Sequence, residues 1–154
     1  MPTLNPGDRA PDFTVDSDTD GAVTLSDLRG RTVVLYFYPK DDTPGCTVQA
    51  CDFRDALPRF EGIDAVILGV SADDVESHLA FREKFDLNFP LLADVGGVVS
   101  DLYGVWGERD VDGRKLMGIE RSTFVIGPDG VIREAWYGVD ARGHMDRLAA
   151  LLGA

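Results

Sequence analysis

Apolar runs divide the chain into segments that alternate between two periodicities. Residues 32–38 and 65–71 are continuous stretches rich in β-branched and aromatic side chains, which is typical of strands buried on both faces. Residues 46–60 and 75–85 instead place apolar side chains on one face with charges between them. This second pattern predicts two amphipathic helices, one after each buried strand.

Two β-hairpins are also predicted. Around the turn-forming sequence Asp18-Thr19-Asp20-Gly21, apolar positions alternate in two short strands that contain Phe13, Val15, Val23 and Leu25. Later in the chain, strands at residues 122–126 and 131–137 flank Pro128-Asp129-Gly130, a sequence that favours a tight turn.

The rest of the pattern predicts a short strand at residues 91–92 and helices near 98–103 and at 143–152. In the helix at 75–85, we expect Leu79 and Phe81 to face the core. This order implies a mixed central β-sheet flanked by helices, with an N-terminal β-hairpin. It is the order of the α/β thioredoxin-like sandwich. Since the sequence has no repeat and no long linker, we predict that residues 1–154 form a single domain.

The charge of the chain restricts its candidate partners. The 154 residues include 27 acidic and 15 basic side chains, which gives a formal charge of −12. Such a surface repels phosphate backbones and anionic membranes, so we expect no nucleic acid and no membrane as partners. The charge serves solubility, although adaptation to a salty cytoplasm could also produce it. Because the sequence shows neither a long apolar run nor a secretory signal pattern, we expect a cytoplasmic location.

The cysteine content points to chemistry. Cys46 and Cys51 are the two cysteines of the chain. A reducing cytosol would keep a purely structural disulfide open, so a pair five positions apart indicates a redox role. His78 and His144 lie far from the cysteines without ligand spacing, and we expect no metal. We also expect no cofactor, since Gly96-Gly97 lacks the spacing of a phosphate-binding loop.

Cys46 is predicted to lie at the start of a helix. It follows the first buried strand, and Pro44-Gly45 favours a sharp turn that would place Cys46 in the first helical turn. The free backbone N–H groups and the helix dipole favour an anion there, which for a cysteine is the nucleophilic thiolate. A helix N-terminus and one well-placed cation would lower the pKa of the thiol enough to make it mostly thiolate at neutral pH. Lys40 is on the approach loop, so we expect the cation from elsewhere in the fold, with Arg121 as the candidate.

Several motifs together resemble those of the peroxiredoxins, and among them the bacterioferritin comigratory protein, or Q-type, group. Pro39, Thr43 and Cys46 match the signature Pro-x-x-x-Thr/Ser-x-x-Cys at its spacing. The other matches are Gly7-Asp8-x-Ala10-Pro11-Asp12-Phe13, Gly104-Val105-Trp106-Gly107-Glu108 and Arg121-Ser122-x-Phe124. The resemblance covers essentially the whole chain, and the combination is specific where a lone Thr-x-x-Cys would not be.

The resemblance implies a cofactor-free thiol peroxidase that reduces hydrogen peroxide and organic hydroperoxides. It implies that Cys46 is the peroxidatic nucleophile, which becomes a sulfenic acid, and that Cys51 resolves it to an intrachain disulfide. Thr43 would bond the peroxide, and Arg121 would hold the thiolate and polarise the O–O bond. Pro39 would screen the sulfenate from bulk water. A thioredoxin-type dithiol protein would reduce the disulfide.

Helix geometry constrains that disulfide. Residues five apart on one helix have Cα atoms at least roughly 7.5 Å apart and side chains turned by about 140°. A disulfide needs Cα atoms within about 7 Å. Either the first turns unwind after oxidation or the helix already breaks between Cys46 and Cys51. We predict local unwinding, because a helix end opens at the lowest cost. An intrachain resolving cysteine needs no second subunit, so we expect a monomer.

Each assignment has a simpler alternative. Cys46 could be a buried core cysteine, and Cys51 could be only a packed helix residue. Thr43 could cap the helix, and Arg121 could form a surface salt bridge. Among functions, a disulfide reductase of the same fold is disfavoured because it uses Cys-x-x-Cys, with two intervening residues rather than four. A redox sensor or holdase would use the same cysteines as a switch, without sustained turnover.

Overall fold

The structure, a computed structural model, describes residues 3–19, 21–111 and 113–153. Its strands are β1 (Thr14–Asp16), β2 (Ala22–Thr24), β3 (Thr32–Phe37), β4 (Ala65–Ser71), β5 (Leu91–Ala93), β6 (Trp106–Val111), β7 (Arg114–Ile119), β8 (Ser122–Ile126) and β9 (Ile132–Tyr137). Its helices are the short 3-10 helix η1 (Leu25–Leu28), α1 (Pro44–Glu61), α2 (Val75–Phe85), α3 (Val98–Leu102) and α4 (His144–Leu152). None of the helices in the described part of the chain has the length and apolar character needed to span a bilayer.

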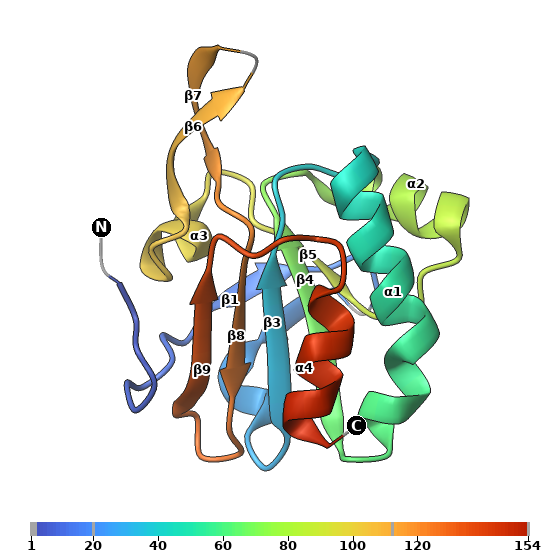
Figure 1. The fold of residues 1–154 in the computed structure, drawn as a ribbon, viewed down its shortest axis with the longest axis vertical. Coiled ribbons are helices and arrows are strands. Elements are labelled where there is room, and N and C mark those ends of the chain that lie inside the picture. Colours follow the sequence, from blue (N-terminus) through green and yellow to red (C-terminus); the bar gives the residue numbers. More distant parts are fainter. Residues whose placement is uncertain (1–2, 20, 112, 154) are drawn as a thin grey trace.

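Five strands form the central sheet, in the order β5-β4-β3-β8-β9 (Figure 1). β3, β4 and β5 are parallel, whereas β8 runs antiparallel to β3 and β9 antiparallel to β8. β3 is central and almost entirely buried, as its continuous apolar run predicts. β1 pairs with β2 as the predicted N-terminal hairpin, although Asp20 of the predicted turn lies outside the described residues. The predicted fold class, a mixed sheet flanked by helices, is confirmed.

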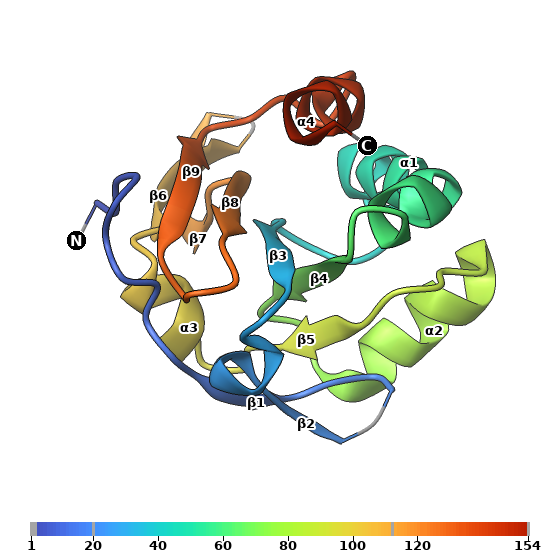
Figure 2. The same cartoon turned by 90° about the horizontal axis from the view of Figure 1, so that it is seen from below.

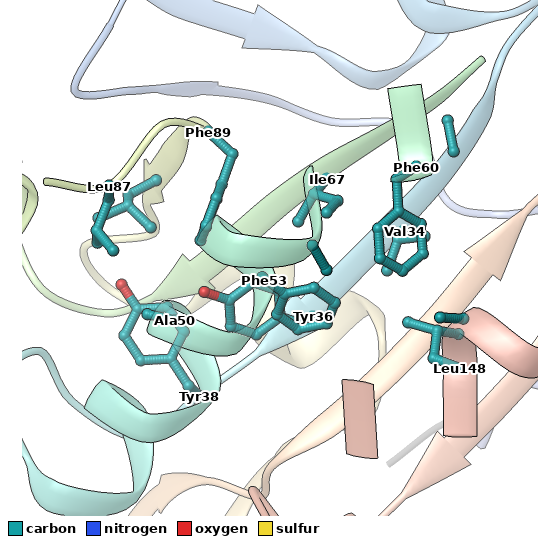
Figure 3. Close-up of a cluster of buried hydrophobic side chains, with 14 of the residues drawn as sticks. Val34, Tyr36, Tyr38, Ala50, Phe53, Phe60, Ile67, Leu87, Phe89 and Leu148 are labelled. Carbon is teal, nitrogen blue, oxygen red and sulfur yellow. The ribbon is translucent and has the colours of Figure 1, made fainter. Parts of the chain in front are cut away.

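The helices cover both faces of this sheet. Figure 2 shows α1, α2 and α4 on one side, with α3 and the N-terminal segment on the other. The side under α1 contains a cluster of buried aromatic residues (Figure 3). In it the rings of Tyr36, from β3, and Phe53, from α1, stack with their centroids 4.7 Å apart. The middle of α1 is therefore fixed firmly against the central strand.

The inner face of α2 differs from the prediction. Phe81 is buried as expected, but Leu79 is 46% exposed, so the expectation that Leu79 faces the core is wrong. The inward position belongs to the neighbouring His78, which is fully buried. A histidine is tolerated there because Asp41 and the Leu92 carbonyl satisfy its two ring nitrogens.

The hairpin β6–β7 has no counterpart in the predicted elements. Its strands pair from Trp106 opposite Ile119 to Val111 opposite Arg114, and it extends beyond the central sheet at the end where α1 begins (Figure 1). β7 is exposed over most of its length. Because no face of this strand is half-buried along its length, its sequence lacks the alternation by which strands are recognised.

Candidate active site at the start of α1

Cys46 lies in the first turn of α1, beyond the carboxyl end of the central strand β3. The helix begins at Pro44, two residues earlier than the predicted start, and Thr43 occupies the N-cap position with extended backbone. Proline suits the first helical position because its φ is already helical and it has no N–H to leave unpaired. Cys46 is only 1% exposed. The predicted placement of this thiol at a helix N-terminus is therefore observed.

Arg121 reaches the sulfur of Cys46 from the neighbouring strand. It precedes Ser122, the first residue of β8, and Ser122 pairs with Phe37 at the end of β3. This register brings Arg121 to the start of α1, although 75 positions separate it from Cys46 in the sequence. Its Nη2 donates to Cys46 Sγ at 3.3 Å. Because a guanidinium carries its charge at physiological pH, Arg121 places a positive charge directly against the sulfur of Cys46.

Gln49 orients the same guanidinium. Arg121 Nη1 donates to Gln49 Oε1 at 2.6 Å, while Nη2 is directed to the sulfur. Gln49 lies three residues after Cys46, so the two side chains share one face of α1. Gln49 is buried, and its Nε2 has no hydrogen-bond partner among the described residues. The residue type alone does not mark Gln49 in the sequence, and its i+3 spacing from Cys46 is the signal that could identify it.

Gly45 leaves room for this arrangement. A Cβ at this position would lie 3.1 Å from Arg121 Nη2 and 3.8 Å from the Cβ of Ala141. Carbon–nitrogen contacts that short are repulsive, so the guanidinium would have to move. Pro44 thus sets the entry into the helix, and Gly45 allows the close approach of the cation.

Thr43 and Pro39 lie in the loop between β3 and α1. The Thr43 hydroxyl donates to the carbonyl of Lys40 at 2.9 Å, and it does not cap the described helix. Since its proton is used in this way, the Thr43 oxygen is left as a hydrogen-bond acceptor. Both Thr43 and Pro39 are half-buried.

Cys51 lies on the same helix as Cys46. α1 is continuous from Pro44 to Glu61, and both cysteines are free thiols. Cys51 is half-buried and lies more than one turn after Cys46. Of the two alternatives for disulfide formation, the continuity of α1 leaves unwinding, because the intact helix keeps the two sulfurs apart.

A buried polar cluster supports the loop that leads into α1. The Asp41 carboxylate accepts hydrogen bonds from the Tyr38 hydroxyl at 2.6 Å and from the Ser77 hydroxyl at 2.8 Å. It lies 2.7 Å from His78 Nδ1, and the backbone N–H of Asp41 donates to Asp73 at 2.8 Å. Asp41, Asp73 and His78 offer metal-ligating atoms within 4.8 Å of one another. The atoms that face one another there are hydrogen-bonded within the protein, which fits a polar network better than a metal site.

The surroundings shift the pKa of three side chains in this region. Burial would lower the pKa of His78, but the hydrogen bond and charge of Asp41 outweigh it and raise that pKa. Burial, with the charges of Arg147 and Arg121, lowers the pKa of His144 to about 4. Burial and the charge of Cys46 raise the pKa of Tyr36 well above its ordinary value. At neutral pH, Tyr36 and His144 are therefore uncharged, whereas the surroundings of His78 favour the imidazolium.

Comparisons with known proteins agree with the resemblance found in the motifs. The model of the AhpC/TSA family matches residues 6–135. Peroxiredoxin Bcp of Bacillus subtilis is 46% identical over 143 residues, which cover 93% of this chain and 91% of that protein. The bacterioferritin comigratory protein of Xanthomonas campestris, studied for its alkyl peroxide reduction activity, matches with a TM-score of 0.87 and 37% identity, over 98% of this chain and 96% of that one. PrxQ of Xylella fastidiosa matches with a TM-score of 0.93 and 38% identity, over 99% and 98%.

Replacing Gly45 by alanine should separate the stability of α1 from the reactivity of its first turn. The added methyl group displaces the guanidinium of Arg121, so Cys46 should react several-fold more slowly with a small alkylating agent at neutral pH. Alanine favours the helix, so thermal unfolding should show equal or higher stability, by up to about 1 kcal/mol. The Cys51→Ser background restricts the alkylation to Cys46. Undiminished reactivity of Cys46 would contradict the role of the close approach.

Proposed function

The chain belongs to the AhpC/TSA family and is a thiol-dependent peroxidase, and we propose that Cys46 is the residue that attacks the hydroperoxide. The observation that carries this assignment is the 3.3 Å contact between Arg121 Nη2 and the Cys46 sulfur in the first turn of α1. The helix N-terminus and the fixed guanidinium both stabilise a thiolate at this point. Cys51, further along α1, is remote from that terminus.

In the first step, the Cys46 thiolate attacks the terminal oxygen of the hydroperoxide and the O–O bond breaks. The sulfur is oxidised by two electrons to a sulfenic acid, and the departing alkoxide takes up a proton to give the alcohol, or water from hydrogen peroxide. Arg121 stabilises the negative charge that develops on the leaving oxygen. The Thr43 hydroxyl accepts a hydrogen bond from the incoming hydroperoxide, because its own proton is directed to Lys40. Pro39 shields the sulfur from bulk water.

In the second step, the Cys51 thiolate attacks the sulfenic sulfur. The Cys46–Cys51 disulfide forms, and the hydroxide that leaves is protonated to water. The first turns of α1 unwind to allow this step, since the folded helix holds the sulfurs apart. A thioredoxin-type dithiol then returns two electrons to the disulfide, as membership of the family implies. We further propose that the enzyme is a single-domain monomer of the cytoplasm, because one chain carries both cysteines.

The division of roles between the cysteines can be tested by serine variants. Cys46→Ser should abolish peroxide consumption, since no other thiol lies at the helix start. Cys51→Ser should retain the first reduction of peroxide but stall turnover with a thioredoxin system. Stopped-flow oxidation measures the first event and a coupled steady-state assay the second. Rapid first-turnover oxidation of Cys46→Ser would overturn the assignment, and a wild-type protein that stops after one equivalent would indicate a sensor rather than an enzyme.

The contribution of Arg121 can be tested by Arg121→Ala beside Arg121→Lys. Alanine removes the donor and the charge, whereas lysine keeps the charge but cannot bond the sulfur and Gln49 at once. We expect the rate of peroxide attack to fall by about 10²- to 10³-fold in Arg121→Ala, as for the loss of one oriented donor at an anion site, and by less in Arg121→Lys. Arg31→Ala, which removes an exposed arginine before β3, is the control. Equal rates for Arg121→Ala and this control would remove Arg121 from the site.

The unwinding step makes a prediction that does not depend on kinetics. On oxidation to the disulfide, residues 46–54 should lose amide-exchange protection, while the central strand β3 keeps its own. The physical reason is that the disulfide cannot form on the helix seen here. Hydrogen exchange with mass spectrometry on the reduced and oxidised forms measures both segments. Equal protection of residues 46–54 in the two forms would show that no unwinding takes place.

A further inference from the structure

Asp41 is buried in a loop whose neighbouring side chains are exposed. It lies five residues before Cys46 and two before Thr43, and its side chain is 4% exposed. A carboxylate is retained at this depth only when donors replace its lost hydration. Tyr38, which follows β3, donates to one carboxylate oxygen, and Ser77 and His78 of α2 both contact the other. The loop that leads into α1 is therefore tied to α2.

The geometry around His78 determines its charge. His78 Nε2 lies 2.8 Å from the carbonyl of Leu92, which can only accept, so this nitrogen carries a proton. His78 Nδ1 lies 2.7 Å from the carboxylate of Asp41, which also only accepts, so both ring nitrogens act as donors. The other groups that face the ring are the Tyr38 hydroxyl, 3.5 Å from Nδ1, and the charge of Asp73. Asp41 and His78 thus form a buried ion pair.

This pair fixes the chain immediately before α1. The backbone N–H of Asp41 is held by Asp73, and Asp42 has a φ of 57° in the left-handed region. The carboxylate of Asp42 pairs in turn with Lys84 of α2 at 2.7 Å. The chain is anchored up to residue 42, and α1 begins at Pro44. Any unwinding of the first turns must therefore pivot about this anchored point.

We propose that Asp41 and His78 are positioning residues whose buried ion pair clamps the entrance to α1 and sets how readily its first turns unwind. The clamp acts through the chain and does not touch the sulfur. Peroxide attack requires the folded start, where Cys46 contacts Arg121, and disulfide formation requires the unwound start. The pair therefore sets the balance between the two steps. The effect of the clamp on the two catalytic steps rests on the proposed function, whereas its effect on the unwinding of the helix does not.

Removing either Asp41 or His78 should make the first turns of α1 unwind more readily, because the charge of the remaining partner is left buried without compensation. His78→Gln and Asp41→Asn are the test variants. Asp74→Ala is the matched control, since it removes the N-cap of α2 without removing a contact to Asp41. In the reduced proteins, amide exchange of residues 42–51 should accelerate about tenfold or more in both test variants. The strands β3 and β8 should exchange as in the wild type. Asp74→Ala releases the N–H of Ser77 but keeps the Asp41–His78 pair, so it should loosen residues 42–51 far less than the test variants do.

Two results would overturn the clamp: wild-type protection of residues 42–51 in both test variants, or equal loosening of that segment in Asp74→Ala. This experiment uses no peroxide, so its result tests the clamp whether or not the proposed peroxidase mechanism is correct. Single-turnover kinetics then test the link to function. In His78→Gln, sulfenic acid formation should slow while the following disulfide formation speeds up, and a change of both steps in the same direction would contradict the proposed balance.

The clamp can also be tested in the wild-type protein, by measuring how amide exchange depends on pH. An ion pair that raises a histidine pKa stabilises the fold fully below the ordinary value of about 6.5 and is lost as pH rises through the folded value. After correction for intrinsic exchange rates, opening of residues 42–51 in the wild type should therefore increase as pH rises above this ordinary value of about 6.5. His78→Gln should lack this dependence. The same pH dependence in both proteins would show that His78 does not control the helix entrance.

Discussion

The contact between the Arg121 guanidinium and the Cys46 sulfur is the interaction on which the site depends, and it requires a mixed sheet. β8 runs antiparallel to β3, so its first residue, Ser122, lies beside Phe37 at the carboxyl end of β3. The residue that precedes β8 therefore reaches the start of α1. In a parallel arrangement, the beginning of that strand would lie at the opposite edge of the sheet. The antiparallel pair thus brings the cation to the helix terminus that favours an anion.

In the proposed cycle, the start of α1 must be folded for peroxide attack and unwound for disulfide formation. The stacking of Phe53 on Tyr36 fixes the middle of α1, so opening can be confined to its first turns. Residues at a helix start lack the full set of intrahelical hydrogen bonds and are the cheapest to release. Cys51 lies between the first turn and Phe53, so the firmly packed part of α1 begins just after the residue that we propose forms the disulfide with Cys46.

The features of the fold and of the site that could be predicted from the sequence are those that depend on residues adjacent to one another in the chain. Local pattern is enough to predict the continuous apolar run of β3, the Pro44-Gly45 turn, and a helix whose first turn contains Cys46. Gln49 and the Asp41–His78 pair depend on which elements the fold brings together, and Asp41 and His78 are 37 positions apart. The wrong expectation for Leu79 has the same cause, because periodicity cannot show that a paired histidine occupies the inner face. The hairpin β6–β7 was hidden because its exposed strand β7 has no apolar alternation.

The two buried histidines make the stability of the fold depend on pH in opposite directions. His144 is buried uncharged with a pKa of about 4, so the unfolded chain binds the extra proton first and stability falls as pH drops below the ordinary value of about 6.5. His78 has its pKa raised by Asp41, so its contribution is complete at low pH and is lost as pH rises. Acid therefore weakens the fold around α4, and base weakens the entrance to α1. These two dependences on pH have opposite signs, so the fold around α4 and the entrance to α1 are together best stabilised between the acidic and the basic range.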